Sequence, residues 1–465
     1  MRALACAFAV SVLGLSGAGD VWAQTNPPSS PSSPSPPSAP KPPRSGVSRV
    51  VEALALDLAK VMPGAFVVAA PLVSDPPAPR GAELSVLLAT QLAGRLGTGA
   101  RASSAPLSLA DAREKAHGSS GLVYVTATVS AGKLRVAVDV FPVPKTVWAR
   151  IRDPEPGPVA HAFAEATLDA EVRSYLAPIP LTAANVVRGQ NFESEVLALA
   201  CGDLDGDGAL EILSVSRKRV TTLRLREGKV VPLRSRSWSD LSPPSSSPLR
   251  EPIGVAGLSE RNAADGSVLR FAEVGSTDRA KALRLDGDLS VVTTLVSLPL
   301  VLGETSGCAR VAAPLLVAPL LPCFAGDPTP SFALSGSFDA LATATLISPK
   351  GDSSLVVASR DERGVTTVRD DAGHQVVVEG AGAQLAVGDL DQDGEPEILS
   401  ALDVANADGD AVVVRSWTRS KPSRLKELFR LPAAAGVYAL GVCPPDDSGR
   451  APFVVATADE IWVVR

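Results

Sequence analysis

One stretch of this sequence occurs twice, and its second copy lies far along the chain. Residues 197–214 read LALACGDLDGDGALEILS, and residues 385–400 read LAVGDLDQDGEPEILS. Around both copies, short Val- and Leu-rich runs alternate with turns, and no long helical pattern interrupts them. Such alternation is typical of strands, and self-similarity within one chain indicates a repeat architecture. The second half of the chain is therefore predicted to be an array of repeated β-units, each of roughly 45 to 60 residues, as in propeller blades.

Further segments follow the same four-strand rhythm without the acidic stretch. They run from Ile253 to Leu298 and from Phe338 to Glu379, while the last segment, Val437 to Arg465, holds only three strand-like runs. A closed ring would complete that last unit with a strand from its other end, and Leu181 to Arg188 is a candidate. Residues 299–335 fit either a degenerate blade or an insertion. We expect five to seven blades, with six favoured.

Each copy of the repeat carries a D-x-D-x-D-G-x-x-E loop. The acidic positions are Asp203, Asp205, Asp207 and Glu211 in the first copy, and Asp389, Asp391, Asp393 and Glu397 in the second. Four carboxylates within nine positions repel one another unless a cation lies among them, and Ca²⁺ prefers six to eight oxygen ligands. An EF-hand would need Glu at position 12, where Ser214 and Ser400 stand, so that interpretation fails. A solvated acidic turn is the simpler alternative.

The segments "ALACGDLDGDGALEIL" and "QLAVGDLDQDGEPEIL" resemble the FG-GAP/VCBS repeat of integrin-type β-propellers. The resemblance implies that each loop joins the first two strands of a blade. It also implies Ca²⁺ at the eight carboxylates named above, in a structural role. Segments 259–267, 348–353 and 443–450 lack the acidic set, and no ion is assigned to them or to the hairpin at 403–410.

Five cysteines occur in the chain, and Cys6 lies in a predicted leader. The remaining four suggest two disulfides in an oxidising compartment, although three pairings are possible. In a closed propeller ring, Cys201 on the first blade and Cys443 on the last blade would be neighbours. We therefore expect a Cys201–Cys443 bond that latches the ring and a local Cys308–Cys323 bond.

The beginning of the chain divides into three parts. Residues 1–23 have the charged start, apolar run and small-residue end of a signal peptide, and residues 24–45 form a Pro/Ser-rich linker. Residues 46–180 are expected to form a small α/β domain. Its helices are predicted near 47–61, 82–96, 109–117 and 159–176, and its strands near 65–72, 122–129, 134–141 and 146–151.

The element order of this domain resembles the N-terminal domain of TolB and FlgO/CsgG-type envelope domains. The matching segments are "FVVAAPLVSD", "GAELSVLLATQLAGRL", "GLVYVTATVSAGKLRVAVDVFPV" and "TVWAR". The fold class expected for the whole chain is thus multidomain, a small α+β domain followed by an all-β propeller. His117 and His161, each in a stretch expected to be polar and helical, are interpreted as surface residues.

The net charge and the absence of common catalytic motifs narrow the classes of function that the chain could have. Lys and Arg total 44 and Asp and Glu 50, a net charge of −6, which argues against nucleic-acid binding. None of the common nucleophile, phosphate-binding or zinc-protease motifs occurs, and His374 lies in an expected hairpin turn. We expect an exported non-enzymatic protein, periplasmic or extracellular, that binds a protein or glycan and has no transmembrane segment in its mature chain. The alternatives are a TolB-like envelope accessory protein and a carbohydrate-active enzyme built on a propeller.

Overall fold

The computed structural model places most of the chain after the predicted leader and linker. It describes residues 45–465 apart from short gaps at 59–63, 98, 182–184, 194, 247–248, 263–266, 304, 313–314, 325–326, 328, 331, 333, 351, 420–421 and 447–448. The predicted signal peptide and nearly all of the Pro/Ser-rich linker lie outside the described residues. Residues 42–465 make one compact unit.

The first part of this unit combines helices with a mixed sheet. Its helices are α1 (Gly46–Asp57), α2 (Gly81–Leu96), α3 (Leu109–Lys115), α4 (Val147–Arg152) and α5 (Ala170–Arg173). Its strands are β1 (Phe66–Ala69), β2 (Val73–Ser74), β3 (Arg101–Ala102), β4 (Gly121–Ser130), β5 (Lys133–Pro142) and β6 (Ala160–Thr167). The sheet order is β3-β1-β4-β5-β6, with β2 beside β4. Strand β1 runs parallel to β3 and β4, whereas β4, β5 and β6 are antiparallel.

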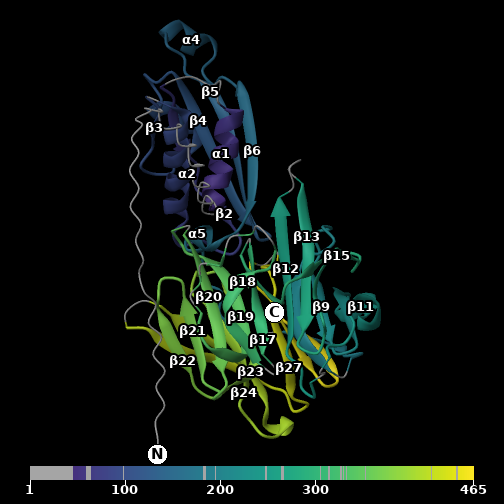
Figure 1. The fold of residues 1–465 in the computed structure, drawn as a ribbon. Helices are drawn as coiled ribbons and strands as arrows, with labels where there is room; N and C mark the ends of the chain where they lie inside the picture. The colour runs from purple at the N-terminus through teal and green to yellow at the C-terminus, as the bar shows by residue number, and fades with distance from the viewer. Residues whose placement is uncertain are drawn as a thin grey trace, which may run out of the picture. The chain divides into compact units, whose positions relative to one another are not determined.

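Helices α1 and α2 lie against one face of this sheet (Figure 1), because each carries a continuous apolar stripe. On α1, Val47, Val50 and Leu54 are buried, and the Ser45 hydroxyl caps the helix by accepting the backbone N–H of Ser48 at 3.2 Å. On α2, Leu84 and Leu88 are among the buried residues. These helices, α3 and the β4–β5 hairpin were predicted from the sequence and are confirmed.

Two predictions in this part were wrong. Residues 146–151, expected as a strand, form α4, whose first turn is capped by the Thr146 hydroxyl accepting the backbone N–H of Ala149 at 3.1 Å. Residues 159–176, expected as a helix, form β6 followed by the single turn α5. Strand β6 pairs with β5 along its whole length, so its residues alternate between the buried face and solvent. Pairing with a neighbouring strand thus overrode the helical propensity of this alanine-rich segment.

The second part consists almost entirely of strands. They are β7 (Val186–Gln190), β8 (Val196–Gly202), β9 (Glu211–Ser216), β10 (Arg219–Arg226), β11 (Lys229–Ser237), β12 (Gly254–Asn262), β13 (Val268–Ser276), β14 (Ala282–Leu285), β15 (Val291–Leu295), β16 (Leu298–Leu302), β17 (Thr305–Ala312), β18 (Leu315–Pro322), β19 (Ser337–Ile347), β20 (Ser353–Asp361), β21 (Thr366–Asp370), β22 (Gln375–Val378), β23 (Ala381–Gly388), β24 (Glu397–Leu402), β25 (Ala411–Thr418), β26 (Arg424–Pro432), β27 (Val437–Val442), β28 (Phe453–Thr457) and β29 (Glu460–Val464). Short helical turns, α6 (Trp238–Leu241) and η1 (Ala407–Gly409), join some of them.

The strands form consecutive antiparallel sheets. Strands β8–β11, β12–β15 and β23–β26 each make a four-stranded sheet, and β16–β22 make a continuous seven-stranded one. The strands expected within 253–298 and 338–379 are therefore confirmed. Residues 299–335 supply most of β16 and all of β17 and β18, and β18 joins β19 through only two paired positions, Leu316 with Phe338 and Val317 with Ser337.

The first strand of each sheet and β19, an inner strand of the seven-stranded sheet, lie side by side around a common centre. Going round, β8 contacts β12, then follow β16, β19, β23 and β27, and β27 returns to contact β8. The last sheet has the order β27-β28-β29-β7, so a strand from the start of this part completes it. This closing strand was predicted within 181–188 and lies at Val186–Gln190. Antiparallel sheets set around a centre and closed in this way form a β-propeller.

Both predicted disulfides are present in the second part. Cys201 on β8 bonds to Cys443, which directly follows β27, with their Cα atoms 4.7 Å apart. Cys308 on β17 bonds to Cys323 after β18, with a Cα separation of 5.0 Å. The first of these bonds joins the two sheets at which the ring closes.

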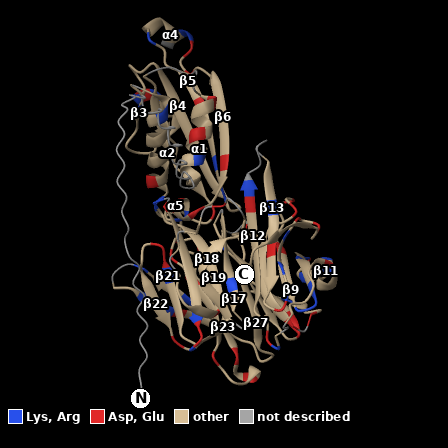
Figure 2. Cartoon of the chain, viewed as in Figure 1, with Lys and Arg blue, Asp and Glu red and all other residues tan. Residues whose placement is uncertain are grey.

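Charged residues of both signs are interspersed over both parts of the molecule in the view of Figure 2. Among the described residues, no helix combines the length and the apolar character needed to cross a membrane.

Candidate metal centre and central pocket

The two acidic loops occupy equivalent places in their sheets. The first joins β8 to β9, and the second joins β23 to β24. In each loop the final glutamate, Glu211 or Glu397, begins the second strand and is only 1% exposed. Its Oε2 accepts the backbone N–H of the second loop residue, Leu204 or Leu390, at 2.8 Å. In both copies this hydrogen bond therefore ties the start of the loop to the buried glutamate at its end.

The first aspartate of each loop braces the turn. Oδ2 of Asp203 accepts the backbone N–H of Gly208 at 3.1 Å, and Oδ2 of Asp389 accepts that of Gly394 at 2.9 Å. Gly208 and Gly394 have φ angles of 84° and 85°, a region in which a Cβ atom is strained, so the turn requires glycine there.

Three carboxylates converge in each loop. One oxygen each from Asp203, Asp205 and Glu211, and likewise from Asp389, Asp391 and Glu397, lie within 4.8 Å of one another. The remaining predicted ligands, Asp207 and Asp393, stay outside these groups. Each instead accepts the backbone N–H two residues later, that of Ala209 at 2.9 Å and that of Glu395 at 2.7 Å. The structure thus brings together six of the eight predicted ligands, three in each loop.

A guanidinium neutralises the first loop. Arg224 on β10 is paired in register with Glu211 and contacts its carboxylate. The same guanidinium lies 2.7 Å from Oδ2 of Asp207 and 3.2 Å from Oδ2 of Asp205. The backbone N–H of Ala209 and the charge of Arg224 together hold the pKa of Asp207 below its usual value. Arg224, with Arg234 at 3.6 Å from Asp205 and Arg270 at 3.8 Å from Asp203, therefore supplies the positive charge that a metal ion would otherwise provide.

The second loop has no cation opposite its glutamate. The residue paired in register with Glu397 is Ser416. Among the described residues, no arginine or lysine forms an ion pair with Asp389, Asp391 or Glu397. Arg419 lies close by, but it binds Oε2 of Glu395 at 3.0 Å and the carbonyl oxygen of Gly394.

The uncompensated carboxylates of the second loop consequently resist ionisation. Burial, reinforced by the charges of Asp393 and Asp391, raises the pKa of Asp389 to about 8. Burial and the charge of Asp393 raise the pKa of Asp391 to about 6. The pKa of Glu397 is also well above its usual value, because of burial first and then the charge of Asp391. Such a cluster needs either protons or a cation, so its donor set fits a hard metal ion.

Neither sequence copy reveals this difference, because the position opposite the glutamate lies on another strand. Arg224 follows a short β9–β10 turn, whereas Ser416 follows a longer connection that contains η1. The two residues therefore stand at different spacings from their glutamates. Only the strand register shows that they are equivalent.

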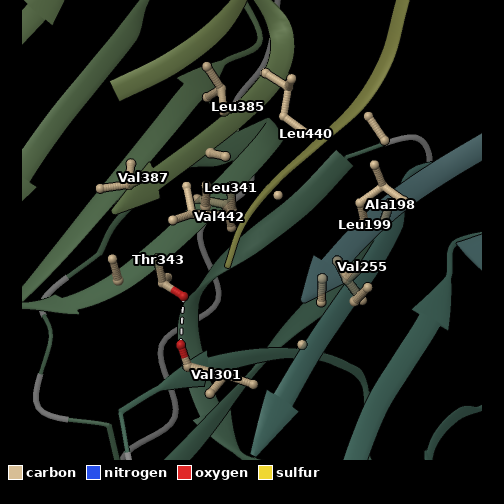
Figure 3. A pocket seen from close by; sticks show the side chains of 18 of the residues that line it. Ala198, Leu199, Val255, Val301, Leu341, Thr343, Leu385, Val387, Leu440 and Val442 are labelled. Atoms are coloured by element: carbon tan, nitrogen blue, oxygen red, sulfur yellow. Dashed lines mark hydrogen bonds between the residues drawn. The ribbon is translucent and has the colours of Figure 1, made fainter. Parts of the chain in front are cut away.

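A large pocket lies at the centre of the ring, with a volume of about 1420 Å³. Figure 3 shows its wall, which is built from the innermost strands and is largely aliphatic. Its labelled lining residues are Ala198, Leu199, Val255, Val301, Leu341, Thr343, Leu385, Val387, Leu440 and Val442. The Thr343 hydroxyl donates to the carbonyl oxygen of Val301 at 2.6 Å, which ties β19 to β16.

Polar side chains also contribute to the lining, among them Thr345, Gln384 and Gln392. Charged lining residues such as Glu195, Arg250 and Asp339 lie just before an innermost strand or near its start, and Tyr438 is the aromatic residue among those that line the pocket. The pocket was not predicted from the sequence. Alternating Val and Leu residues predict strands, but they do not show which strand edges face the centre of the ring.

The three histidines do not assemble a site among the described residues. His117 follows α3, as expected for a helical stretch. His161 lies on β6 rather than on a helix, and its Nδ1 is 2.8 Å from Oδ1 of Asp139. His374 lies in the β21–β22 turn, with its Nδ1 2.8 Å from Oδ2 of Asp370. None of them lines the central pocket.

No protein-family model matches the chain, and no curated protein matches it. Among solved structures, TolB from Acinetobacter baumannii is similar over 87% of this chain and 94% of its own, with 11% identity and a TM-score of 0.28. The WD40 domain of Toxoplasma gondii coronin is similar over 62% of this chain and 88% of its own, with 11% identity and a TM-score of 0.28. A glucose dehydrogenase covers 61% of this chain and 98% of its own, with 10% identity and a TM-score of 0.31. The propeller arrangement of this chain therefore rests on its own strand order and not on these likenesses.

Proposed function

We propose that this chain is an exported, non-enzymatic binding protein with a Ca²⁺-stabilised propeller of the FG-GAP/VCBS type. The observation that carries the proposal is the cluster of the half-buried Asp389 and Asp391 with the buried Glu397, two of whose pKa values lie well above the usual range for an aspartate. The two disulfides support export, because such bonds persist mainly in oxidising compartments.

Calcium suits the second loop better than the first. Ca²⁺ takes oxygen ligands in a flexible shell, and three converging carboxylates supply the core of one. An ion bound there would offset the mutual repulsion of the carboxylates and tie the end of β23 to the start of β24. The first loop already has this link through Arg224, so an ion would have to displace the guanidinium.

We count six blades. Their innermost strands are β8, β12, β16, β19, β23 and β27, and the blade that begins with β16 has three strands where the others have four. On this count the seven-stranded sheet is two blades joined by the short β18–β19 contact. Six lies within the usual range of four to eight blades.

The ligand is a protein rather than a glycan. Sugar hydroxyls that pack against the aliphatic side chains of the innermost strands would lose their hydrogen bonds to water. By contrast, β8, β12, β16, β23 and β27 are each the end strand of a sheet, so each has a backbone edge without a strand partner. An extended peptide segment with small apolar side chains could pair with such an edge and fill the pocket.

Calcium binding is tested by titration calorimetry on the chain and on an Asp389→Asn, Asp391→Asn double variant. We expect saturable binding of Ca²⁺ to the unmodified protein and its loss in the variant. Asp408→Asn, at an exposed position in η1, is the matched control and should bind as the unmodified protein does. A protein that releases no heat with millimolar Ca²⁺ would contradict the metal assignment.

The ligand class is tested by placing a photo-crosslinking amino acid at Leu341 in the pocket and, as a control, at the exposed Glu227 in the β10–β11 turn. In cells we expect a discrete protein adduct from position 341 and none from position 227. Equal labelling from both positions would argue against the pocket as the ligand site. Turnover of a polysaccharide by the purified chain would instead favour an enzyme.

A further inference from the structure

The connection between β5 and β6 carries an apolar surface that no part of the described chain covers. We call residues 145–152 the α4 knob, since they contain the short helix α4 and its N-cap. Val147, Trp148 and Ile151 in the knob are 62%, 80% and 67% exposed. Their spacing of i, i+1 and i+4 places all three on one face of the helix. Figure 1 shows α4 beyond the end of the β4–β5–β6 sheet.

Exposing these apolar side chains to water is unfavourable, and no contact within the described chain offsets that free-energy cost. Single exposed apolar residues are ordinary, but a contiguous group that includes a tryptophan marks an interaction surface. The other described tryptophans, Trp238, Trp417 and Trp462, are all at most 5% exposed. Among the described tryptophans, Trp148 alone is therefore exposed to solvent.

The charges around the knob specify the partner. Lys145 and Arg152 are exposed at its two ends. Downstream, Glu155 forms an ion pair with Arg113 at 3.2 Å, and among the described residues Asp153 forms none. An apolar helical face with basic residues at its ends matches the boundary of an anionic bilayer, where tryptophan lies among the headgroups and cationic groups reach the phosphates.

The geometry points to membrane docking: we infer that the α4 knob inserts reversibly into the surface of a bilayer that contains anionic lipid. Trp148 and Ile151 enter the boundary between headgroups and acyl chains, and Lys145 and Arg152 contact the headgroup phosphates. A knob projects from the molecule, so it can enter a lipid surface without a complementary groove. This inference is independent of the calcium site and of the ligand in the pocket.

The test is co-sedimentation with vesicles of phosphatidylcholine alone and with vesicles that also contain phosphatidylglycerol. We expect the protein to bind the anionic vesicles, and the double variant Trp148→Ser, Ile151→Ser to bind them at least about tenfold more weakly. Leu56→Ser is the matched control, because Leu56 is 73% exposed on α1 and should not affect binding. All variants share the same N-terminal segment, so a difference between them reports the knob.

Insertion itself is read from quenching of Trp148 fluorescence by lipids brominated on their acyl chains. With Trp22 of the predicted leader replaced by phenylalanine in every sample, we expect quenching in the parent protein and little in Trp148→Phe, because the other described tryptophans are buried. Failure of the unmodified protein to bind either vesicle would overturn the inference and leave the knob as a protein-docking surface. Equal binding by the double variant would overturn it as well.

Discussion

Arg224 and Ser416 stand opposite equivalent glutamates, and this difference separates the surroundings of the two glutamates. The Arg224 guanidinium offsets the charge of the carboxylates that it contacts without a metal. A serine hydroxyl carries no charge, so the same carboxylates in the second loop share burial and repulsion. At the scale of one residue, the first loop thus has a positive charge opposite its glutamate and the second loop has none.

Exchanging these two residues should exchange the behaviour of the loops. In Ser416→Arg we expect the Ca²⁺-dependent rise in melting temperature, a few degrees at saturating ion for a chain of this size, to disappear. In Arg224→Ser we expect lower stability in EGTA and a larger recovery with Ca²⁺ than in the unmodified protein. Gln375→Arg adds the same charge at an exposed position on β22 and serves as the control. Unchanged Ca²⁺ responses in both variants would show that the register does not select the loop.

The raised pKa values of Asp389 and Asp391 predict a pH dependence. In the absence of metal the folded protein binds more protons at these groups than the unfolded chain, whose aspartates titrate near about 3.9. The stability that they contribute is present at low pH and is lost as pH rises through about 6 and about 8.

Melting curves in EGTA should therefore show this loss over that range, and the stabilisation by Ca²⁺ should widen over the same range. The Asp389→Asn, Asp391→Asn variant should lose the pH-dependent component. Parallel pH profiles for the variant and the unmodified protein would count against the assignment.

At the scale of an element, the glycine that precedes each acidic loop lies where two neighbouring sheets approach each other closely. Gly202 ends β8, and a Cβ atom placed on it would lie 2.7 Å from Cδ1 of Leu258 on β12. Gly388 ends β23 in the same way, with a Cβ atom 2.5 Å from Cγ1 of Val442 on β27. At Gly388 the close approach is to the branched Cβ of Val442 as well, at 3.0 Å, so glycine is favoured there by the next innermost strand and not by the loop itself.

Gly388→Ala should accordingly destabilise the protein by about 1–3 kcal/mol, the usual range for an added methyl group in a tightly packed interior. Gly94→Ala is the matched control. A Cβ atom at Gly94 on α2 meets nothing within 4 Å, so alanine there should stabilise the helix by about 0.5–1 kcal/mol. Urea unfolding measures both changes, and a neutral Gly388→Ala would mean that the strands can move apart at no cost.

For the whole molecule, closure of the ring is the decisive event. Strand β7 comes from the start of the propeller and completes the sheet made by its last strands, and Cys201–Cys443 joins the same two ends over 242 positions. Both connections link residues far apart in the chain. They restrict the unfolded ensemble much more than a local crosslink does.

Removing the Cys201–Cys443 bond by serine substitutions should therefore cost about 5 kcal/mol, against about 3 kcal/mol for the Cys308–Cys323 bond with its separation of 15 positions. Chemical denaturation of the two double variants measures the difference. If both variants lost equal stability, the long bond would not act as the latch of the ring.

Features that depend on residues close together in the sequence were predicted from the sequence alone. The apolar stripes of α1 and α2, the strand rhythm of the second part and the two D-x-D-x-D-G-x-x-E loops all arise from periodicity and turn chemistry within short segments. Even the Cys201–Cys443 pairing followed once the chain was taken to form a closed ring.

Tertiary structure decided the rest. Pairing with β5 made residues 160–167 a strand. Strand register placed Arg224 opposite the glutamate of one acidic loop and Ser416 opposite the glutamate of the other. Closure of the ring created the central pocket. Each of these depends on which residues of distant strands come to lie opposite one another. Such contacts are set by packing and hydrogen bonding over the whole fold, so the spacing of residues along the chain does not contain them.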